Sequence, residues 1–163
     1  MVLIRDATED DWPHIWPILR QIVRAGETYA YDPDIDEETA RALWLVGPPA
    51  RTAVAVAEDR TVVGTANMYA NRAGPGSHVA SASFMVDPGA SGQGVGRALG
   101  EDALACARAS GFRAMQFNAV VETNTRAVAL WRSLGFEIIG TVPDAFCHPT
   151  DGYVGLHVVY RRL

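Results

Sequence analysis

The sequence has little cysteine, no long hydrophobic run and no excess of basic residues. Its two cysteines, Cys106 and Cys147, are too few for a disulfide framework and do not form a metal-ligand pair. No apolar run approaches the ~20 residues that a membrane span needs, and the first residues do not resemble a signal peptide. A net charge of −5 argues against electrostatic binding of nucleic acid. These absences predict a cytoplasmic protein with no metal, nucleic acid or membrane partner.

The length and composition are typical of one folded unit. The chain has 163 residues, of which 48% are hydrophobic and 20% are charged, as in an ordinary globular protein. It contains no internal repeat and no linker rich in glycine, proline or serine. We therefore expect a single domain that spans residues 1–163.

The hydrophobic periodicity predicts seven strands and four helices. The expected strands are 2–5, 52–57, 61–69, 77–86, 115–121, 136–142 and 154–160. The expected helices are 8–23, 36–45, 94–110 and 123–134. Pro17 is expected to bend or break the first helix, and an irregular loop is expected between the last two strands. Consecutive strands followed by strand-helix alternation predict an α/β fold, with antiparallel N-terminal strands, one parallel crossover and helices on both faces of a mixed sheet.

The most informative segment is a glycine-rich turn between a strand and a long helix, residues 86–99. Its glycines allow the backbone to approach a ligand closely, and the N–H groups of the first helical turn form an anion site. A phosphate is therefore the ligand that this segment favours. It is not a dinucleotide fingerprint, because position 97 is Arg97 and not glycine, and it is not a P-loop, because Val95 follows Gly94.

Two motifs together resemble the GNAT superfamily of N-acetyltransferases. The glycine turn is similar to the acyl-CoA pyrophosphate loop of that family, with Gly94 and Gly96 matching and Ser91 at the usual Arg/Gln position. Residues 124–136 resemble the second family motif, Asn-x-x-Ala-x-x-Leu-Tyr-x-x-x-Gly-Phe, except that Trp131 stands at the tyrosine. Residues 26–30 and 116–121 are similar to branches that act on small amines, the phosphinothricin-type and proline-analogue acetyltransferases.

The resemblance implies a set of site residues for acetyl-CoA and an amine acceptor. Val86 would bind the pantetheine through its backbone, and backbone N–H groups near it would polarise the acetyl carbonyl. Asn124 would lie near the pantetheine or acceptor. The implied acetyl-CoA-binding residues are Val86, Gly92, Gln93, Gly94, Val95, Gly96, Arg97, Ala98 and Asn124. The implied acceptor-binding residues are Tyr29, Tyr31 and Asn118, with Phe146 and Tyr153 in segments near them.

Two departures from the family pattern concern catalysis. The family tyrosine often protonates the departing thiolate, and the indole of Trp131 cannot, so we expect Trp131 to pack in the core. A thiol with a pKa of ~8.5 leaves unprotonated at a cost of roughly 2 kcal/mol, which slows catalysis without preventing it. No glutamate stands on the fourth strand. The candidate bases and further catalytic residues are Glu27, Glu122, His78, His148 and Asn124.

The absence of an evident strong base bears on the substrate. An α-amine with a pKa near 8 needs about 1 kcal/mol for deprotonation at neutral pH, whereas a lysine amine needs roughly 4 to 5 kcal/mol. The sequence therefore favours an acetyl-CoA-dependent N-acetyltransferase for a small, amino-acid-like amine. Two alternatives remain, a non-catalytic acyl-CoA sensor and a peptide or protein N-acetyltransferase. The resemblance also implies a possible homodimer.

Overall fold

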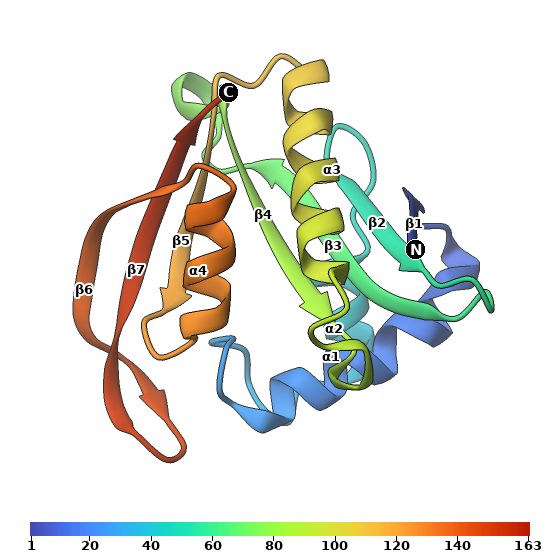
Figure 1. The fold of residues 1–163 in the computed structure, drawn as a ribbon, viewed down its shortest axis with the longest axis horizontal. Coiled ribbons are helices and arrows are strands. Elements are labelled where there is room, and N and C mark those ends of the chain that lie inside the picture. Colours follow the sequence, from blue (N-terminus) through green and yellow to red (C-terminus); the bar gives the residue numbers. More distant parts are fainter.

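A seven-stranded mixed sheet organises the chain in a computed structural model that describes all 163 residues (Figure 1). The strands are β1 (Leu3–Asp6), β2 (Arg51–Val56), β3 (Val62–Ala70), β4 (Val79–Val86), β5 (Ala114–Val121), β6 (Glu137–His148) and β7 (Gly152–Arg162). Their order across the sheet is β1-β2-β3-β4-β5-β7-β6. Only β4 and β5 pair in parallel, and every other neighbouring pair is antiparallel. The expected mixed sheet with one parallel crossover is therefore confirmed.

Helices cover both faces of the sheet, as expected. They are α1 (Trp12–Ala25), α2 (Glu37–Trp44), α3 (Val95–Ala109) and α4 (Thr125–Ser133). Val54 of β2 belongs to the core cluster that α1 and α2 form, whereas the adjacent Ala55 packs in a cluster with Val95 and Leu99 of α3. Successive side chains of a strand point to opposite faces, so α1 and α2 lie on one face and α3 on the other. None of the helices is both long and apolar enough to cross a membrane.

The sheet opens between its two parallel strands. β4 and β5 pair only through Val79 with Ala114 and Ala80 with Met115. Beyond these residues both strands continue, and Figure 1 shows them diverging from their shared upper end with α4 in front of the gap. The second half of β4 therefore has one edge without a neighbouring strand.

Strand geometry shows which backbone groups face this gap. The Asp87 N–H donates to the Val63 carbonyl at 2.9 Å, and the Val79 carbonyl accepts from the Asn71 N–H at 2.8 Å. The backbone groups of residues 79 and 87 therefore point toward β3. In an antiparallel pair the bonded residues alternate along the strand. Phe84 and Val86 therefore direct their N–H and C=O groups into the gap.

An aromatic cluster attaches α4 to the two diverging strands. The ring centroid of Trp131 on α4 lies 4.8 Å from those of Phe84 on β4 and Phe117 on β5, and Phe136 completes the cluster. Trp131 is 7% exposed. The packing role expected for Trp131 is confirmed. Its ring lies between α4 and the gap and contacts an aromatic side chain of each diverging strand.

The structure corrects two details of the sequence analysis. Of the bend or break expected at Pro17, the break does not occur, because α1 continues through this residue. Because α1 begins at Trp12, the Pro17 ring removes only one hydrogen bond, near the helix start, and the buried Ile15 and Leu19 hold this segment on the sheet. The prediction of an irregular loop between the last two strands is also wrong. β6 runs to His148, and a register shift between Val142 and Phe146 absorbs the intervening residues as a bulge.

We predict that Gly64→Ala destabilises the fold because α3 rests directly on this glycine. A Cβ there would lie 2.8 Å from Val95 Cγ1 and 3.2 Å from the Met85 carbonyl oxygen. We expect a loss of about 1–3 kcal/mol in the free energy of unfolding, opposite in sign to the ~0.5–1 kcal/mol that alanine usually adds in a strand.

Urea unfolding measures this difference, with Gly140→Ala on β6 as the matched control. A Cβ at Gly140 has no neighbour within 4 Å, so that variant should be as stable as the wild type or slightly more stable. A Gly64→Ala protein that is no less stable than the control would contradict the close packing of α3 on β3.

Candidate functional site

The turn that follows β4 leaves several backbone N–H groups without helical partners. Gly92 and Gly94 both have a φ of 82°, which favours glycine. Gly94 is the N-cap of α3 and no side chain caps the helix. The Ala98 N–H donates to the Gly94 carbonyl at 3.0 Å as the first helical bond. The N–H groups of the three preceding residues are therefore available to an anion at the positive end of the α3 dipole.

An arginine from α4 lies against this turn. Nη1 of Arg126 donates to the Ser91 hydroxyl at 2.9 Å, and Nη2 would be 3.2 Å from a Cβ placed on Gly92. Sequence analysis did not single out Arg126, although its place within the Asn124–Phe136 motif was a usable signal. Arg126 adds a positive charge to the available N–H groups, and this chemistry fits the pyrophosphate of coenzyme A.

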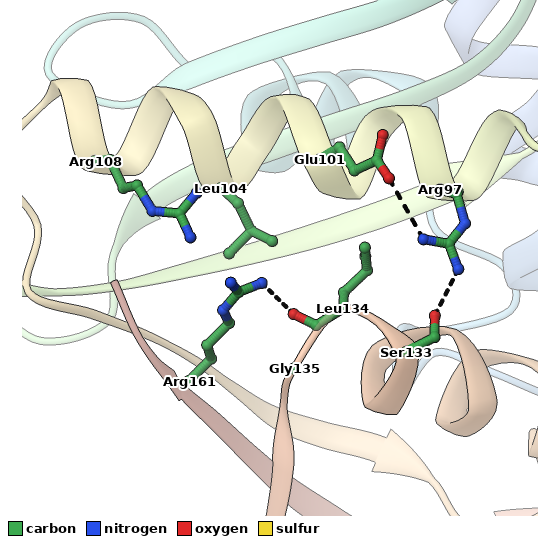
Figure 2. Close-up of a pocket in the computed structure, with 8 residues that line it drawn as sticks. All are labelled: Arg97, Glu101, Leu104, Arg108, Ser133, Leu134, Gly135 and Arg161. Carbon is green, nitrogen blue, oxygen red and sulfur yellow. Dashed lines mark hydrogen bonds and ion pairs between the residues drawn. The ribbon is translucent and has the colours of Figure 1, made fainter.

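Arg97, which sequence analysis did single out, directs its side chain elsewhere. Its guanidinium donates to the Ser133 hydroxyl at 2.7 Å and approaches Glu101 at 3.4 Å (Figure 2). These contacts lie in a cavity of about 460 Å³ between α3 and the C-terminal end of α4, where Arg161 also donates to the Leu134 carbonyl. The Arg97 backbone N–H remains in the first turn of α3, whereas its charged group lies along the helix.

The other expected donor-site residues lie around the mouth of the gap. Val86 is the last residue of β4 and faces the gap through its backbone. Gln93 Nε2 contacts the Gly89 carbonyl at 3.4 Å within the turn. Asn124 is the N-cap of α4, and its Oδ1 accepts from the Ala127 N–H at 3.3 Å. This cap leaves the Asn124 Nδ2 group available to a ligand at the edge of the gap.

Tyr29 and Tyr31 approach the gap from the opposite face. Their rings stack with centroids 5.6 Å apart, and the Tyr29 ring also meets Trp44 edge to face. The Tyr29 hydroxyl donates to the Phe84 carbonyl at 2.6 Å and accepts from the Phe84 N–H at 2.9 Å. Burial raises the pKa of both tyrosines, so both hydroxyls stay protonated at neutral pH.

A buried polar strip on β3 and β4 continues this face and was missed by sequence analysis. Thr65 accepts a hydrogen bond from the Trp44 indole at 3.0 Å, so it faces α2. Asn67 lies two residues further along β3, on the same side, and pairs with Ser83. Asn67 is 3% exposed and its Oδ1 has no hydrogen-bond partner. An asparagine inside a strand is unfavourable, and that was the available signal.

Asn118 belongs to a short polar network at the rim of the gap. Its Nδ2 donates to Asn71 Oδ1 at 2.7 Å, and its Oδ1 accepts from Gln116 Nε2 at 2.9 Å. It lies at the bulge of β5 between Phe117 and Val120, and it is exposed. Asn118 is therefore held in place by Gln116 of β5 and by Asn71, the residue that follows β3, while it remains exposed.

The candidate bases have different surroundings. Glu122 accepts from the Gly155 N–H at 2.6 Å and so holds the β5–β7 pairing. His148 lies at the tip of the β6–β7 hairpin, where its Nδ1 is 3.3 Å from Asp151. His78 precedes β4, at the closed end of the gap, and is therefore remote from Phe84. Glu27 is exposed in the turn after α1.

Phe146 and Tyr153 lie on strands and not in irregular segments as expected. Phe146 on β6 is buried in a small cluster with Val121 and Val154. Tyr153 on β7 is 73% exposed. A bulged hairpin, and not a loop, therefore presents this part of the chain.

The assembled geometry is a pair of separating strands, with the uncapped N-terminus of α3 on one face and Tyr29 and Tyr31 on the other. A sequence model of the acetyltransferase (GNAT) family matches residues 4–136. The chain belongs to the GNAT acetyltransferase family. Its catalytic class is therefore N-acetyltransferase, and a phosphinothricin acetyltransferase with the same fold was solved in complex with acetyl-CoA.

Three individual proteins illustrate the similarity of this GNAT chain to its relatives. A GCN5-related N-acetyltransferase from Kribbella flavida is 64% identical, with a TM-score of 0.97 and coverage of 99% of this chain and 98% of that one. A phosphinothricin acetyltransferase from Sinorhizobium meliloti, solved in complex with acetyl-CoA, is 27% identical, with a TM-score of 0.89 and coverage of 99% and 88%.

The third relative is N-acetyltransferase aca1 from Schizosaccharomyces pombe. It is 31% identical over 99 residues, which cover 60% of this chain and 47% of that protein. The match therefore spans about half the length of that relative.

We predict that Arg126 contributes more to acetyl-CoA binding than Arg97 does. Arg126→Gln should weaken binding about tenfold, the equivalent of about 1.4 kcal/mol, because it removes the cation that lies on the glycine turn. It should also reduce the salt dependence of binding. Arg97→Gln is the matched control and should change the affinity less than about threefold. Calorimetry at low and high salt measures both, and equal losses in the two variants would contradict the assignment.

Proposed function

We propose that this GNAT acetyltransferase transfers the acetyl group of acetyl-CoA to the amine of a small, amino-acid-like molecule. The observation that carries the proposal is the gap between β4 and β5, because it joins an anion site on the α3 face to a polar, tyrosine-lined surface on the α1 face. A donor and an acceptor that enter from opposite faces meet in this gap without passing each other.

The residues divide into a donor set and an acceptor set. The first turn of α3 and Arg126 hold the pyrophosphate, the Val86 backbone holds the pantetheine, and Asn124 Nδ2 lies beside that path. Tyr29, Tyr31 and Asn118 surround the amine. The acceptor side offers neutral hydrogen-bonding groups, which suits a small polar molecule better than a large apolar one.

The thioester supplies an activated acetyl group, and the chain supplies orientation. The amine nitrogen bonds to the carbonyl carbon, the C–S bond breaks, and its electron pair leaves with the CoA sulfur as the thiolate. Holding the two reactants in place is the main contribution, since effective molarities of ~10⁵ M and above are known for well-oriented groups. Trp131 is buried among aromatic rings and donates no proton to that thiolate, which takes one from solvent.

Water accepts the proton of the amine, and the low pKa of the acceptor amine makes this step possible. Glu122 already holds the Gly155 N–H, and His78 lies at the closed end of the gap. An α-amine with a pKa near 8 needs only about 1 kcal/mol to lose its proton at neutral pH. Glu27 is exposed in the turn that also carries Tyr29, and it remains a candidate base.

The deciding experiment is CoA thiol release with acetyl-CoA and a panel of amino acids, proline analogues, phosphinothricin, polyamines and short peptides. The chain has no lysine, so acetylation of its own side-chain amines does not contribute. Its two cysteines set a fixed background that enzyme-only samples subtract. Release with a small amino acid or its analogue supports the proposal. Release only with peptides identifies a protein acetyltransferase, and binding without any release identifies an acyl-CoA sensor.

The pH dependence of kcat/KM should follow the pKa of the acceptor amine and not the pKa of a group on the enzyme. For an α-amine, kcat/KM should rise with pH and level off near pH 8, where the amine is deprotonated. For an acceptor whose amine has a pKa near 10, kcat/KM should keep rising to about that pH. The measurement compares both acceptors in one buffer series. A break at the same pH for both would instead identify a base on the protein, and Glu27→Gln would then be the first variant to examine.

A further inference from the structure

The Tyr29 hydroxyl occupies a stretch of strand edge that has no neighbouring strand. Phe84 lies four residues beyond Ala80, the last β4 residue that pairs with β5. Its N–H and C=O point into the gap, and both bond to the one hydroxyl, at 2.9 Å and 2.6 Å. Tyr29 comes from the turn after α1, 55 residues away in the sequence. A side chain from one face therefore reaches into the gap and completes the hydrogen bonding of β4.

This arrangement excludes a second acceptor at the same place. A backbone N–H carries one proton, and its acceptor must lie about 2.9 Å away in line with that bond. The Tyr29 oxygen occupies this position on Phe84. Any ligand oxygen that accepts from the Phe84 N–H must therefore displace the Tyr29 hydroxyl.

We propose that Tyr29 is a positioning residue that holds the Phe84 edge until a thioester carbonyl replaces it, and that it thereby sets the relative affinity for acetyl-CoA and free CoA. The inference rests on the proposed function, in that Phe84 and Val86 form the donor edge. Free CoA has no acetyl carbonyl and can bind while Tyr29 stays in place. Acetyl-CoA uses the Phe84 N–H and must break both hydrogen bonds of the hydroxyl.

The surroundings of Tyr29 suit a group that leaves and returns. Its raised pKa keeps the hydroxyl neutral, so moving it transfers no charge. Its ring stacks on Tyr31 and contacts Trp44 by its edge. Withdrawal of Tyr29 therefore shifts Tyr31 as well, so occupation of the donor edge alters the acceptor surface. After the acetyl group has left, the Tyr29 hydroxyl can return to Phe84. Its return stabilises the complex with free CoA.

Tyr29→Phe isolates the hydroxyl while it keeps the ring. Without ligand, this variant leaves the Phe84 N–H and C=O without their side-chain partner, which raises the free energy of the empty protein. Acetyl-CoA restores a partner to the N–H and has no hydroxyl to displace. We expect the variant to bind acetyl-CoA about tenfold more tightly than the wild type, and to bind CoA with unchanged affinity. Tyr160→Phe is the matched control, because β5 separates its strand β7 from β4, and it should leave the ratio of the two affinities unchanged.

Isothermal titration of each protein with acetyl-CoA and with CoA, without an amine, measures both affinities and requires no turnover. A selective gain for acetyl-CoA supports the inference. An equal change for both ligands would assign Tyr29 a structural role only, and selectively weaker acetyl-CoA binding would mean that the hydroxyl contacts the thioester directly. Either result overturns the inference. Failure of the wild type to bind either ligand would instead refute the donor site itself.

A measurement on the wild-type chain covers the case in which Tyr29→Phe does not fold. The protein is labelled with 3-fluorotyrosine, and its five tyrosines are followed by ¹⁹F NMR. The Tyr29 resonance is assigned by elimination, with Tyr→Phe variants at the other four positions. It should shift on addition of acetyl-CoA and stay in place on addition of CoA. The same response to both ligands, or to neither, contradicts displacement by the thioester.

Discussion

The divergence of β4 and β5 is the constraint on which the rest of the site depends. Parallel strands that stop pairing after Ala80 and Met115 leave backbone donors and acceptors facing a gap inside the sheet, and such groups are costly to leave without partners. The aromatic contacts of Trp131 with Phe84 and Phe117 hold the strands apart while they exclude water from one face. The gap is therefore a packed feature of the fold, and the Tyr29 hydroxyl pairs with the backbone of Phe84 at its edge.

Local electrostatics at this gap are opposite in sign to the charge of the whole chain. The net charge is −5, yet the donor end combines an uncapped helix N-terminus with the Arg126 guanidinium. A helix terminus acts over about one turn, so the phosphate site that we propose there does not require a basic protein. The acceptor end carries neutral tyrosines and amides. This separation is what the proposed function requires, with an anionic donor on one face and a polar acceptor on the other.

The same geometry explains how the chain can work without the usual tyrosine of the family. Trp131 serves the packing that creates the gap, and the roughly 2 kcal/mol lost with an unprotonated thiolate is small beside the contribution of orientation. Tyr29 is the hydroxyl nearest to the donor edge, but it enters from the other face and its raised pKa makes it a poor acid. It both donates to and accepts from the backbone of Phe84.

Local sequence patterns were sufficient for the element order, the glycine turn and the packing of Trp131. Each of these depends on residues that are close in the chain or on burial of a large apolar ring. The same patterns failed at Pro17 and at the β6–β7 bulge, because packing outweighed local preference there. A pattern shows that a hairpin is interrupted, but the partner strand decides whether the interruption becomes a loop or a bulge.

By itself, the sequence determined the fold class and the glycine turn before α3, because backbone geometry and helix starts are encoded by neighbouring residues. Only the tertiary structure decided which side chains meet at the gap. It brought Arg126 to the glycine turn while Arg97 turned towards Ser133, and it placed the Tyr29 hydroxyl on the backbone of Phe84. These contacts join residues separated by 35 to 55 positions. They arise from the packing of helices on opposite faces of the sheet, and local periodicity in the sequence does not predict such contacts.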